Sequence, residues 1–173
     1  MAHILIDGYN LIRTTTLLGS RLLSLEKERQ ELIRQLAAYK RIKGHRVTVV
    51  FDATKTEYSS ISEGKEAGIH YVYTKGGQTA DEVLMMLARK LGRAVVVVSS
   101  DQAIISTARQ AGAGVLTSPE FADHVRQASH LEENPFGKKD SDAKKNPHKR
   151  WITQKKGPSK RLPKSKRRAL EKL

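Results

Sequence analysis

The sequence predicts a three-layer α/β domain with a mostly parallel central sheet, followed by a basic, disordered tail. Short apolar or β-branched runs alternate along the chain with segments whose apolar residues recur at helical spacing. Such alternation is typical of parallel strands covered by helices on both faces. From residue 134 onward the pattern stops, and lysine, arginine and proline dominate. We therefore expect a folded domain over residues 1–133 and a tail over residues 134–173 that stays disordered without nucleic acid.

The elements of the first half follow in order. Residues 3–6 predict a buried strand that runs into Asp7 and Gly8, where glycine allows a positive φ or a close approach of the backbone. Residues 11–23 fit either a loop or a short helix. Residues 25–43 predict a helix with Ser24 as N-cap and Gly44 as its end. Its inward residues are expected to be Leu25, Leu32, Ile33, Leu36 and Tyr39. Residues 46–51 predict a second strand, which ends at Asp52.

The second half continues the alternation. Residues 53–68 are polar and aperiodic and predict a mobile loop above the strand ends. Residues 69–73 alternate like a strand near an edge. Thr79 and Glu82 have the spacing of a capping box that begins a helix ending at Gly92. A valine-rich strand over residues 94–98, a helix over 102–111 and a short strand at 115–116 follow. Ser118, as N-cap before Pro119, predicts a last helix that ends near residues 129–133.

Composition excludes several classes of protein. The chain of 173 residues is long enough for one domain with its own core. It contains no cysteine, so neither disulfides nor thiolate metal sites are expected. It has no signal-peptide pattern and no apolar run of about 18 residues, the length that suits a membrane helix. We therefore expect a soluble, cytoplasmic protein.

The basic charge is concentrated at one end of the chain. The formal net charge is +14. Residues 1–137 hold 17 basic and 15 acidic residues and carry +2, whereas residues 138–173 hold 15 and 3 and carry +12. Because lysine and arginine runs bind nucleic acid without sequence preference, this partition favours RNA binding by the tail.

Four aspartates stand at equivalent positions of the predicted domain. Asp7, Asp52 and Asp101 follow strands, and Asp81 lies at a helix start. Since parallel strands end at one edge of a sheet, these carboxylates can converge there. Clustered carboxylates repel one another unless a cation neutralises them, and oxygen ligands suit Mg²⁺ or Mn²⁺. Such a metal can activate water and stabilise phosphoryl transfer. Taken singly, each aspartate also fits an ordinary turn or helix cap.

Four short motifs carry these aspartates: Ile6-Asp7-Gly8-Tyr9-Asn10, Val50-Phe51-Asp52, Thr79-Ala80-Asp81-Glu82 and Ser99-Ser100-Asp101. They resemble, in order, the motifs of the YacP-like branch of the NYN domain family of PIN-like nucleases. The resemblance covers roughly residues 2–130, and the short basic chain beyond departs from the family's long helical tail. It implies a PIN-like fold, metal-dependent cleavage of RNA and, for this branch, a link to the translating ribosome, with mRNA as the expected substrate.

The resemblance also implies roles for individual residues. The family's acidic residues carry over onto Asp7, Asp52, Asp81 and Asp101 as catalytic groups. Asp7, Asp81 and Asp101 are then the expected ligands of one or two Mg²⁺ or Mn²⁺ ions, while Asp52 binds directly or through water. Asn10 matches the family's asparagine of the first motif and is expected to contact substrate. Apart from the resemblance, the basic charge suggests which residues hold the phosphate backbone: Arg13, Lys75, Lys164, Lys166, Arg167 and Arg168.

The leading hypothesis is therefore a Mg²⁺- or Mn²⁺-dependent endoribonuclease. An alternative is a non-catalytic RNA- or ribosome-binding protein with a vestigial acidic site, which the tail alone would support. A small-molecule phosphatase is a weaker alternative, because Tyr9 stands where a second aspartate is expected. Neither a dinucleotide-binding glycine motif nor a Walker motif is present.

Overall fold

The computed structural model describes residues 1–14, 24–52, 62–75 and 77–133. Its elements are β1 (His3–Asp7), α1 (Gly8–Thr14), α2 (Leu25–Lys43), β2 (Arg46–Phe51), β3 (Ser62–Glu66), β4 (Ile69–Tyr73), α3 (Ala80–Leu91), the 3₁₀ turn η1 (Gly92–Ala94), β5 (Val95–Val98), α4 (Gln102–Gln110), β6 (Gly114–Leu116) and α5 (Ser118–Glu133). The predicted tail lies outside the described residues.

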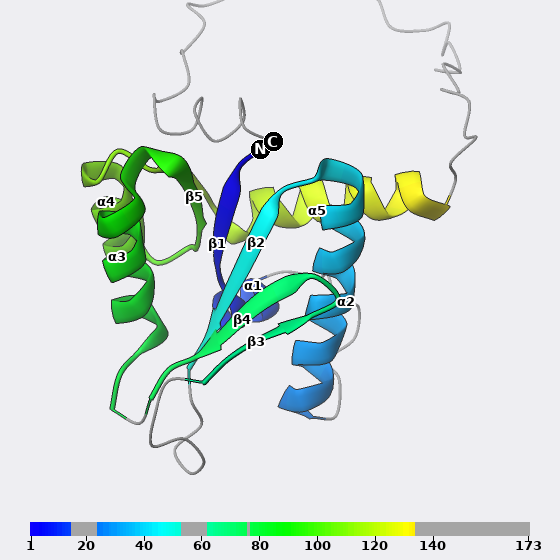
Figure 1. Ribbon diagram of the computed structural model, residues 1–173, viewed down its shortest axis with the longest axis horizontal. Coiled ribbons are helices and arrows are strands. Elements are labelled where there is room, and N and C mark those ends of the chain that lie inside the picture. The colour runs from blue at the N-terminus through cyan, green and yellow to red at the C-terminus, as the bar shows by residue number, and fades with distance from the viewer. Residues whose placement is uncertain (15–23, 53–61, 76, 134–173) are drawn as a thin grey trace, which may run out of the picture.

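The strands form one six-stranded sheet in the order β3-β4-β2-β1-β5-β6. All neighbouring pairs are parallel except β3 and β4. Figure 1 shows α3 and α4 on one side of this sheet and α2 and α5 on the other. The predicted three-layer α/β fold with a mostly parallel sheet is therefore confirmed.

The core has two parts, one on each face of the sheet. Along β1, Ile4 and Ile6 pack with α1, α2 and α5, whereas Leu5 packs with α3 and α4. All three side chains are fully buried. Because β1 pairs with β2 on one side and β5 on the other, its carboxyl end opens at the centre of one edge of the sheet. Ligands of open α/β sheets bind at such an edge.

The predicted helix ends are confirmed at α2 and α3. Ser24 caps α2 by accepting a hydrogen bond from the backbone N–H of Lys27, and Gly44 ends it with φ 70°. Thr79 and Glu82 form the predicted capping box of α3.

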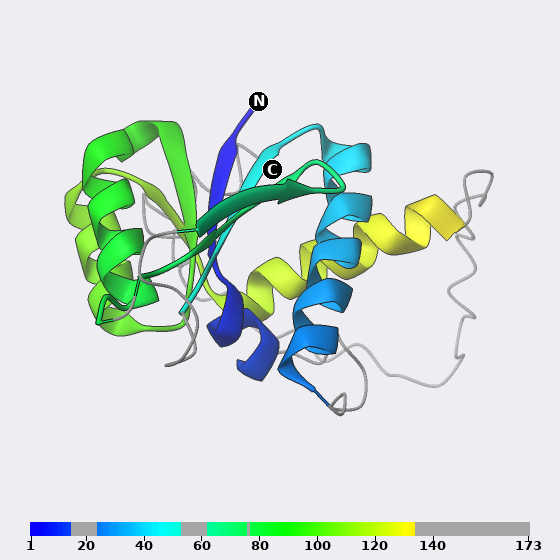
Figure 2. The same ribbon diagram turned by 60° about the horizontal axis from the view of Figure 1, so that its bottom comes forward.

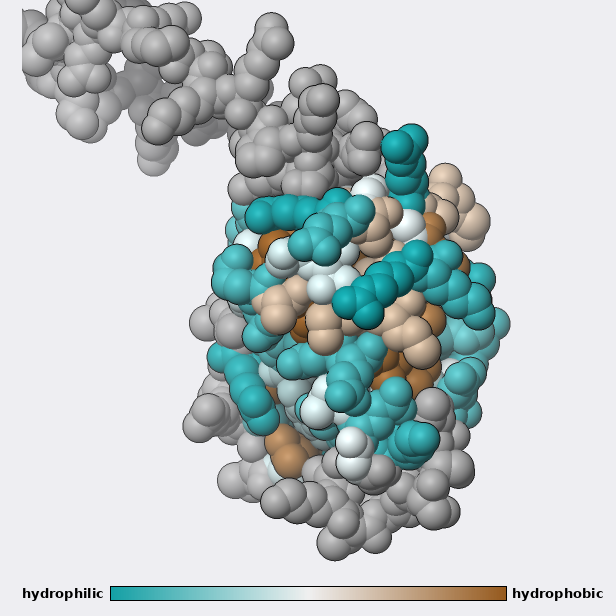
Figure 3. Space-filling model, turned by 90° about the vertical axis from the view of Figure 1, so that its left-hand side faces the viewer, coloured by the Kyte–Doolittle hydropathy of each residue, from teal (hydrophilic) through white to brown (hydrophobic). Residues whose placement is uncertain are grey.

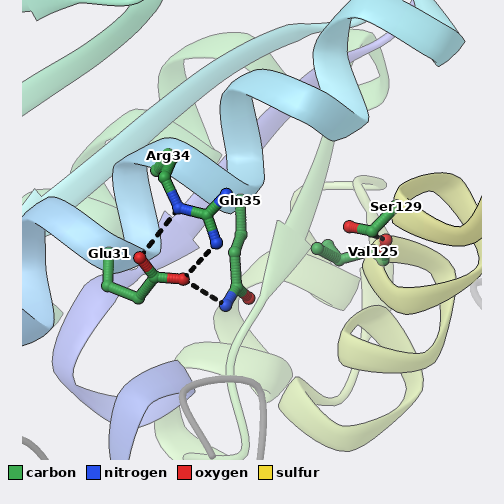
Figure 4. A network of polar contacts seen from close by, with 5 residues as sticks. All are labelled: Glu31, Arg34, Gln35, Val125 and Ser129. Atoms are coloured by element: carbon green, nitrogen blue, oxygen red, sulfur yellow. Dashed lines mark hydrogen bonds and ion pairs between the residues drawn. The ribbon is translucent and has the colours of Figure 1, made fainter. Parts of the chain in front are cut away.

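The outer surface of α2 carries a local polar network. Arg34 and Gln35 both donate to the carboxylate of Glu31, at distances down to 2.6 Å (Figure 4). On the neighbouring α5, the Ser129 hydroxyl donates to the carbonyl of Val125. These contacts stay within single helices, so they support the helices and not the site. No helix of the described part is long and apolar enough to cross a membrane.

Part of the predicted loop after Asp52 is a strand. Residues 62–66 form β3, which pairs with β4 through a tight turn in which Ala67 and Gly68 have φ 47° and 83°. The strand is polar and mostly exposed, so it carries no apolar alternation. Its pairing depends on backbone hydrogen bonds to β4, which side-chain patterns do not reveal. Residues 53–61 lie outside the described ranges.

Two helix starts also differ from the prediction. Leu25, expected to face the core, is 48% exposed. At α5 the cap is Thr117, because its hydroxyl accepts from the backbone N–H of Glu120 while the Glu120 carboxylate accepts from the backbone N–H of Thr117. The hydroxyl of Ser118 is therefore free to bond elsewhere, and its partner lies in the candidate site.

Candidate active site

Asp7 is placed by an abrupt junction between β1 and α1. The helix begins at the next residue, so the Asp7 side chain stands at the carboxyl end of β1 without a connecting loop. Its Oδ1 accepts from the backbone N–H of Asn10 at 3.0 Å, and its Oδ2 accepts from the Ser99 hydroxyl at 3.4 Å. Only 7% of Asp7 is exposed. The carboxylate is thus held by two hydrogen bonds in a largely buried place.

The junction requires glycine at position 8. A methyl group there would lie 2.3 Å from Cε1 of Phe51 and 2.9 Å from Cγ1 of Val49. The φ of Gly8 is not positive, so close approach explains the residue and conformational freedom does not. The side chains that a methyl group would meet there belong to buried residues of β2.

Asp52 joins the end of β2 to the start of α3. Its Oδ1 accepts a hydrogen bond from the backbone N–H of Ala80, the first residue of that helix. Together with the Thr79 capping box, this bond sets the position of the first turn of α3. Asp81 lies in that turn and is partly buried. Asp52 therefore helps to position the segment that presents Asp81.

Asp101 caps α4 at the end of β5. Its Oδ1 accepts from the backbone N–H groups of Ala103 at 2.7 Å and Ile104 at 3.2 Å. The plain capping role considered for this residue is therefore present. Oδ2 accepts no hydrogen bond from the described residues, so capping and a role in the site are compatible.

These side chains line one pocket of about 270 Å³ at the carboxyl edge of the sheet. Its lining residues are Asp7, Tyr9, Asn10, Arg13, Asp52, Asp81 and Asp101. Figure 2 shows α1 following directly from the end of β1 beside the start of α2. Segments far apart in the sequence thus bring the four predicted aspartates, Asn10 and Arg13 to the same cavity. Lys75 is exposed and does not line it, and Lys164, Lys166, Arg167 and Arg168 lie outside the described residues.

The carboxylates perturb one another. The pKa of Asp7 is raised to about 6, chiefly by burial and also by the charges of Asp81 and Asp52, against the two hydrogen bonds that lower it. Burial likewise raises the pKa of Asp81, helped by Asp101 and Asp52. An acidic cluster of this kind would be relieved by a bound cation.

Asn10 connects three elements around the pocket. Its side-chain oxygen accepts from the backbone N–H of Ser100 at 3.1 Å and from the hydroxyl of Ser118 at 2.8 Å. The Ser99 hydroxyl in turn accepts from the backbone N–H of Asp101. The sequence analysis singled out Asn10 but missed Ser118, whose hydroxyl was assigned to a helix cap.

A cationic and aromatic cluster borders the pocket at Tyr9. The guanidinium groups of Arg13 and Arg29 each lie 5.9 Å from the centre of the Tyr9 ring. Arg29 also lies 5.4 Å from the ring of Tyr73, donates to its hydroxyl and pairs with Glu26. Sequence analysis missed Arg29, although it precedes the buried Leu32, Ile33 and Leu36 at the helical spacing of an inward position.

The donor set fits a hydrated divalent cation. Within the described ranges, no group of three acidic or histidine side chains gathers closely enough to hold a metal as it stands. Mg²⁺, however, usually keeps several waters and takes only one or two carboxylates directly. The four carboxylates in the lining and the raised pKa of Asp7 agree with such an ion.

Comparison with known proteins agrees with the resemblance seen in the sequence. The statistical model of the YacP-like NYN domain family matches residues 4–173. The match therefore continues through the basic segment, and the expected departure from the family beyond about residue 130 was wrong. A search of curated proteins found no match.

Two crystal structures of Rae1 (YacP) from Bacillus subtilis are similar to this chain. One shares 30% identity with a TM-score of 0.63, covering 78% of this chain and 79% of that one. The other, of a variant in which a tryptophan is replaced by leucine, shares 28% identity with a TM-score of 0.62 and covers 78% and 80%.

Proposed function

This chain belongs to the YacP-like NYN domain family, PIN-like nucleases that generally use divalent metals, and from that premise we propose that it is a Mg²⁺- or Mn²⁺-dependent endoribonuclease. Family membership supports a nuclease-type function related to RNA. The finer proposal is hydrolysis of RNA phosphodiester bonds, with mRNA on the ribosome as the substrate in the cytoplasm.

One observation carries the proposal: Asp7, Asp52, Asp81 and Asp101 line a single pocket with Arg13 beside them. Burying or crowding acids in this way is unfavourable without a cation. A simple set of caps and turns does not require the four groups to share one cavity. The arrangement therefore favours a site for a cation and a phosphate together.

Each aspartate would have its own role in binding the metal ion. Asp7 and Asp101 would hold the ion directly, Asp81 would support it, and Asp52 would bind directly or through water. The ion, when bound, would supply an activated water and neutralise charge on the phosphate. One or two ions are compatible with four carboxylates. Asp52 also keeps the first turn of α3 in place through Ala80.

Substrate binding would come from the rim of the pocket and from the tail. Arg13 lies beside the acids and is exposed, so its guanidinium can pair with a phosphate oxygen. Residues 1–133 would form the nuclease domain. Residues 134–173, which contain Lys164, Lys166, Arg167 and Arg168, would hold the RNA backbone. Asn10 would hold together the segments around the pocket, and its amide N–H₂ group would contact the substrate.

The test is cleavage of RNA by the full chain with Mn²⁺ or with EDTA, using Asp101→Asn and a control, Asp123→Asn. Asparagine still caps a helix, so Asp101→Asn preserves α4 while removing the charge. Asp123 lies on α5, pairs with Arg126 and does not line the pocket. We expect cleavage only with metal, its loss in Asp101→Asn, and normal cleavage by the control.

Two outcomes would contradict this proposal in different ways. If Asp101→Asn cuts RNA as fast as the wild type, the assigned site is wrong. If the wild type leaves RNA intact with metal, the reaction is repeated with ribosomes. Intact RNA in both reactions would favour the alternative of a non-catalytic RNA- or ribosome-binding protein.

A further inference from the structure

A second pocket of about 300 Å³ lies between α3 and the sheet, at the opposite edge from the acids. Its floor is apolar and includes Leu5, Val72 and Leu87. Val72 and Leu87 are only partly buried, and Met86 beside them is 50% exposed. On the side of the molecule where α3 and α4 lie, Figure 3 shows hydrophobic side chains exposed among hydrophilic ones. We call this pocket the α3 groove.

The rim of the α3 groove is basic. Arg46 and Lys90 are exposed and make no ion pair with the described residues, and Glu63 is the acidic residue among the described lining. His3 and His70 also line the groove. Burial and then the charge of Arg46 lower the pKa of both imidazoles, which agrees with a positive potential in the groove. An apolar floor beside these exposed cations suits an anion with a flat or apolar body.

The α3 groove and the acidic pocket share helix α3 but no lining residue. Asp81 stands at the start of this helix and Lys90 near its end. Nine residues at about 1.5 Å each separate them by about 14 Å along the helix axis. About four nucleotides cover this span at the 3.4 Å spacing of a stacked strand, and fewer do so if the strand is extended.

We propose that the α3 groove binds a nucleotide of the same RNA strand that enters the acidic pocket, with its base on the apolar floor and its phosphate at Arg46 and Lys90. Bases stack on apolar and aromatic surfaces with little sequence preference. Guanidinium and ammonium groups bind phosphate through charge-assisted hydrogen bonds. This inference rests on the proposed function, because it takes RNA as the substrate.

The first test compares two double variants of the full chain. Arg46→Gln with Lys90→Gln removes the rim charges of the groove, and Lys27→Gln with Lys43→Gln removes two exposed charges from α2 on the other face of the sheet. Affinity for a single-stranded RNA oligonucleotide is measured in EDTA across a salt series, so that no cleavage intervenes. All four side chains are exposed, and equal melting temperatures confirm that both variants fold.

We expect the groove variant to bind about tenfold more weakly at 0.1 M salt, with a slope of log K against log salt that is shallower by about 1.4. The α2 variant should bind like the wild type. A groove variant that binds RNA as tightly as the wild type would overturn the inference. Equal losses would also overturn it, because they indicate a general effect of net charge.

A photo-crosslinking experiment tests this inference independently of the proposed function. RNA carrying 4-thiouridine at successive positions is irradiated with the wild type in EDTA, and the crosslinked peptides are identified. Crosslinks within residues 46–48, 69–73 or 83–91, which line the groove, support it whether or not the chain cuts RNA. Crosslinks confined to other segments would overturn it, while cleavage that needs Asp101 would leave the proposed function standing.

Discussion

At the scale of single residues, Asp7 shows how the fold prepares the site. The carboxyl group is almost fully buried at the end of β1 and close to two other acids, and its pKa is raised to about 6. Such a group costs stability when it ionises without a partner. The hydrogen bonds from Asn10 and Ser99 offset part of this cost. The remaining free-energy cost comes from this one side chain, so substitution of Asp7 should reveal it.

We therefore predict that Asp7→Asn is more stable than the wild type at pH 7.5 without metal, by up to about 3 kcal/mol. Because the folded-state pKa is raised from 3.8 to about 6, only the unfolded wild type loses this proton between these values. Wild-type stability thus falls as pH rises through this window and stays low above it. Asparagine does not ionise, so its advantage should vanish towards pH 4.

The measurement is urea unfolding in EDTA at four pH values between 4 and 7.5. Asp123→Asn, at an exposed position of α5, is the control and should show no such pH-dependent gain. A stability difference between Asp7→Asn and the wild type that does not change with pH would contradict the assigned burial and charge effects.

At the scale of elements, the pocket depends on helix starts that meet at one edge of the sheet. Asn10 in α1 accepts hydrogen bonds from Ser100, just before α4, and from Ser118, the first residue of α5. Asp52 similarly connects the end of β2 to α3. Most of these bonds involve backbone N–H groups at helix ends, which otherwise lack partners. Side chains that appear functional in the sequence therefore also join the elements.

From this follows a prediction for Asn10→Ala: a loss of about 1–3 kcal/mol of stability, because it leaves the Ser100 N–H and the Ser118 hydroxyl without their acceptor. Asn10→Asp keeps an acceptor oxygen and should restore part of the loss when a divalent metal balances the added charge. Chemical denaturation of both variants provides the measurement. An Asn10→Ala protein as stable as the wild type would show that this residue acts on substrate alone.

At the scale of the whole molecule, charge is divided between an acidic cavity and a basic end of the chain. The cavity lies at the carboxyl edge of the sheet, while residues 138–173 carry +12 of the +14 net charge. In the proposed function both features bind phosphate, the cavity through a bound cation and the tail through its basic side chains. Metal and RNA binding are therefore separable in experiments on the intact chain.

For the metal, we predict that Mn²⁺ at about 100 times its dissociation constant stabilises the wild type by about 2.7 kcal/mol, which raises its melting temperature by about 5–10 °C. Asp7→Asn should gain much less, because a ligand is lost. Thermal melts over a range of Mn²⁺ concentrations give the comparison. A similar rise in both proteins would indicate binding away from the acidic pocket.

For the tail, we predict that changing Lys164, Lys166, Arg167 and Arg168 to glutamine weakens RNA binding without slowing cleavage at saturating RNA. Four lost phosphate contacts would make the salt slope shallower by about 2.8. Binding across a salt series and single-turnover cleavage are measured on the same preparation. An unchanged slope would exclude these residues from RNA binding, and slower cleavage at saturation would give them a part in the chemistry.

The sequence by itself determined most of the fold. Buried strands such as residues 95–98, and helix ends such as Ser24, Gly44 and Thr79, follow from local rules: apolar runs, side-chain caps and glycine stops. The strand β3 was not predicted, because backbone hydrogen bonds to β4 hold it and its polar side chains show no strand pattern. The short helix α1 was left open because its packing against β2 and α5, and not its propensity, stabilises it.

The candidate site was likewise predictable from the sequence only in part. The positions of Asp7, Asp52, Asp81 and Asp101 after strands and at a helix start were sufficient to expect convergence, because parallel strands end at one edge. Only the tertiary structure decided which other groups join them, since Arg29 and Ser118 reach the site through the packing of α2 and α5. The raised pKa of Asp7 likewise depends on burial and on neighbours distant in sequence, which no local pattern specifies.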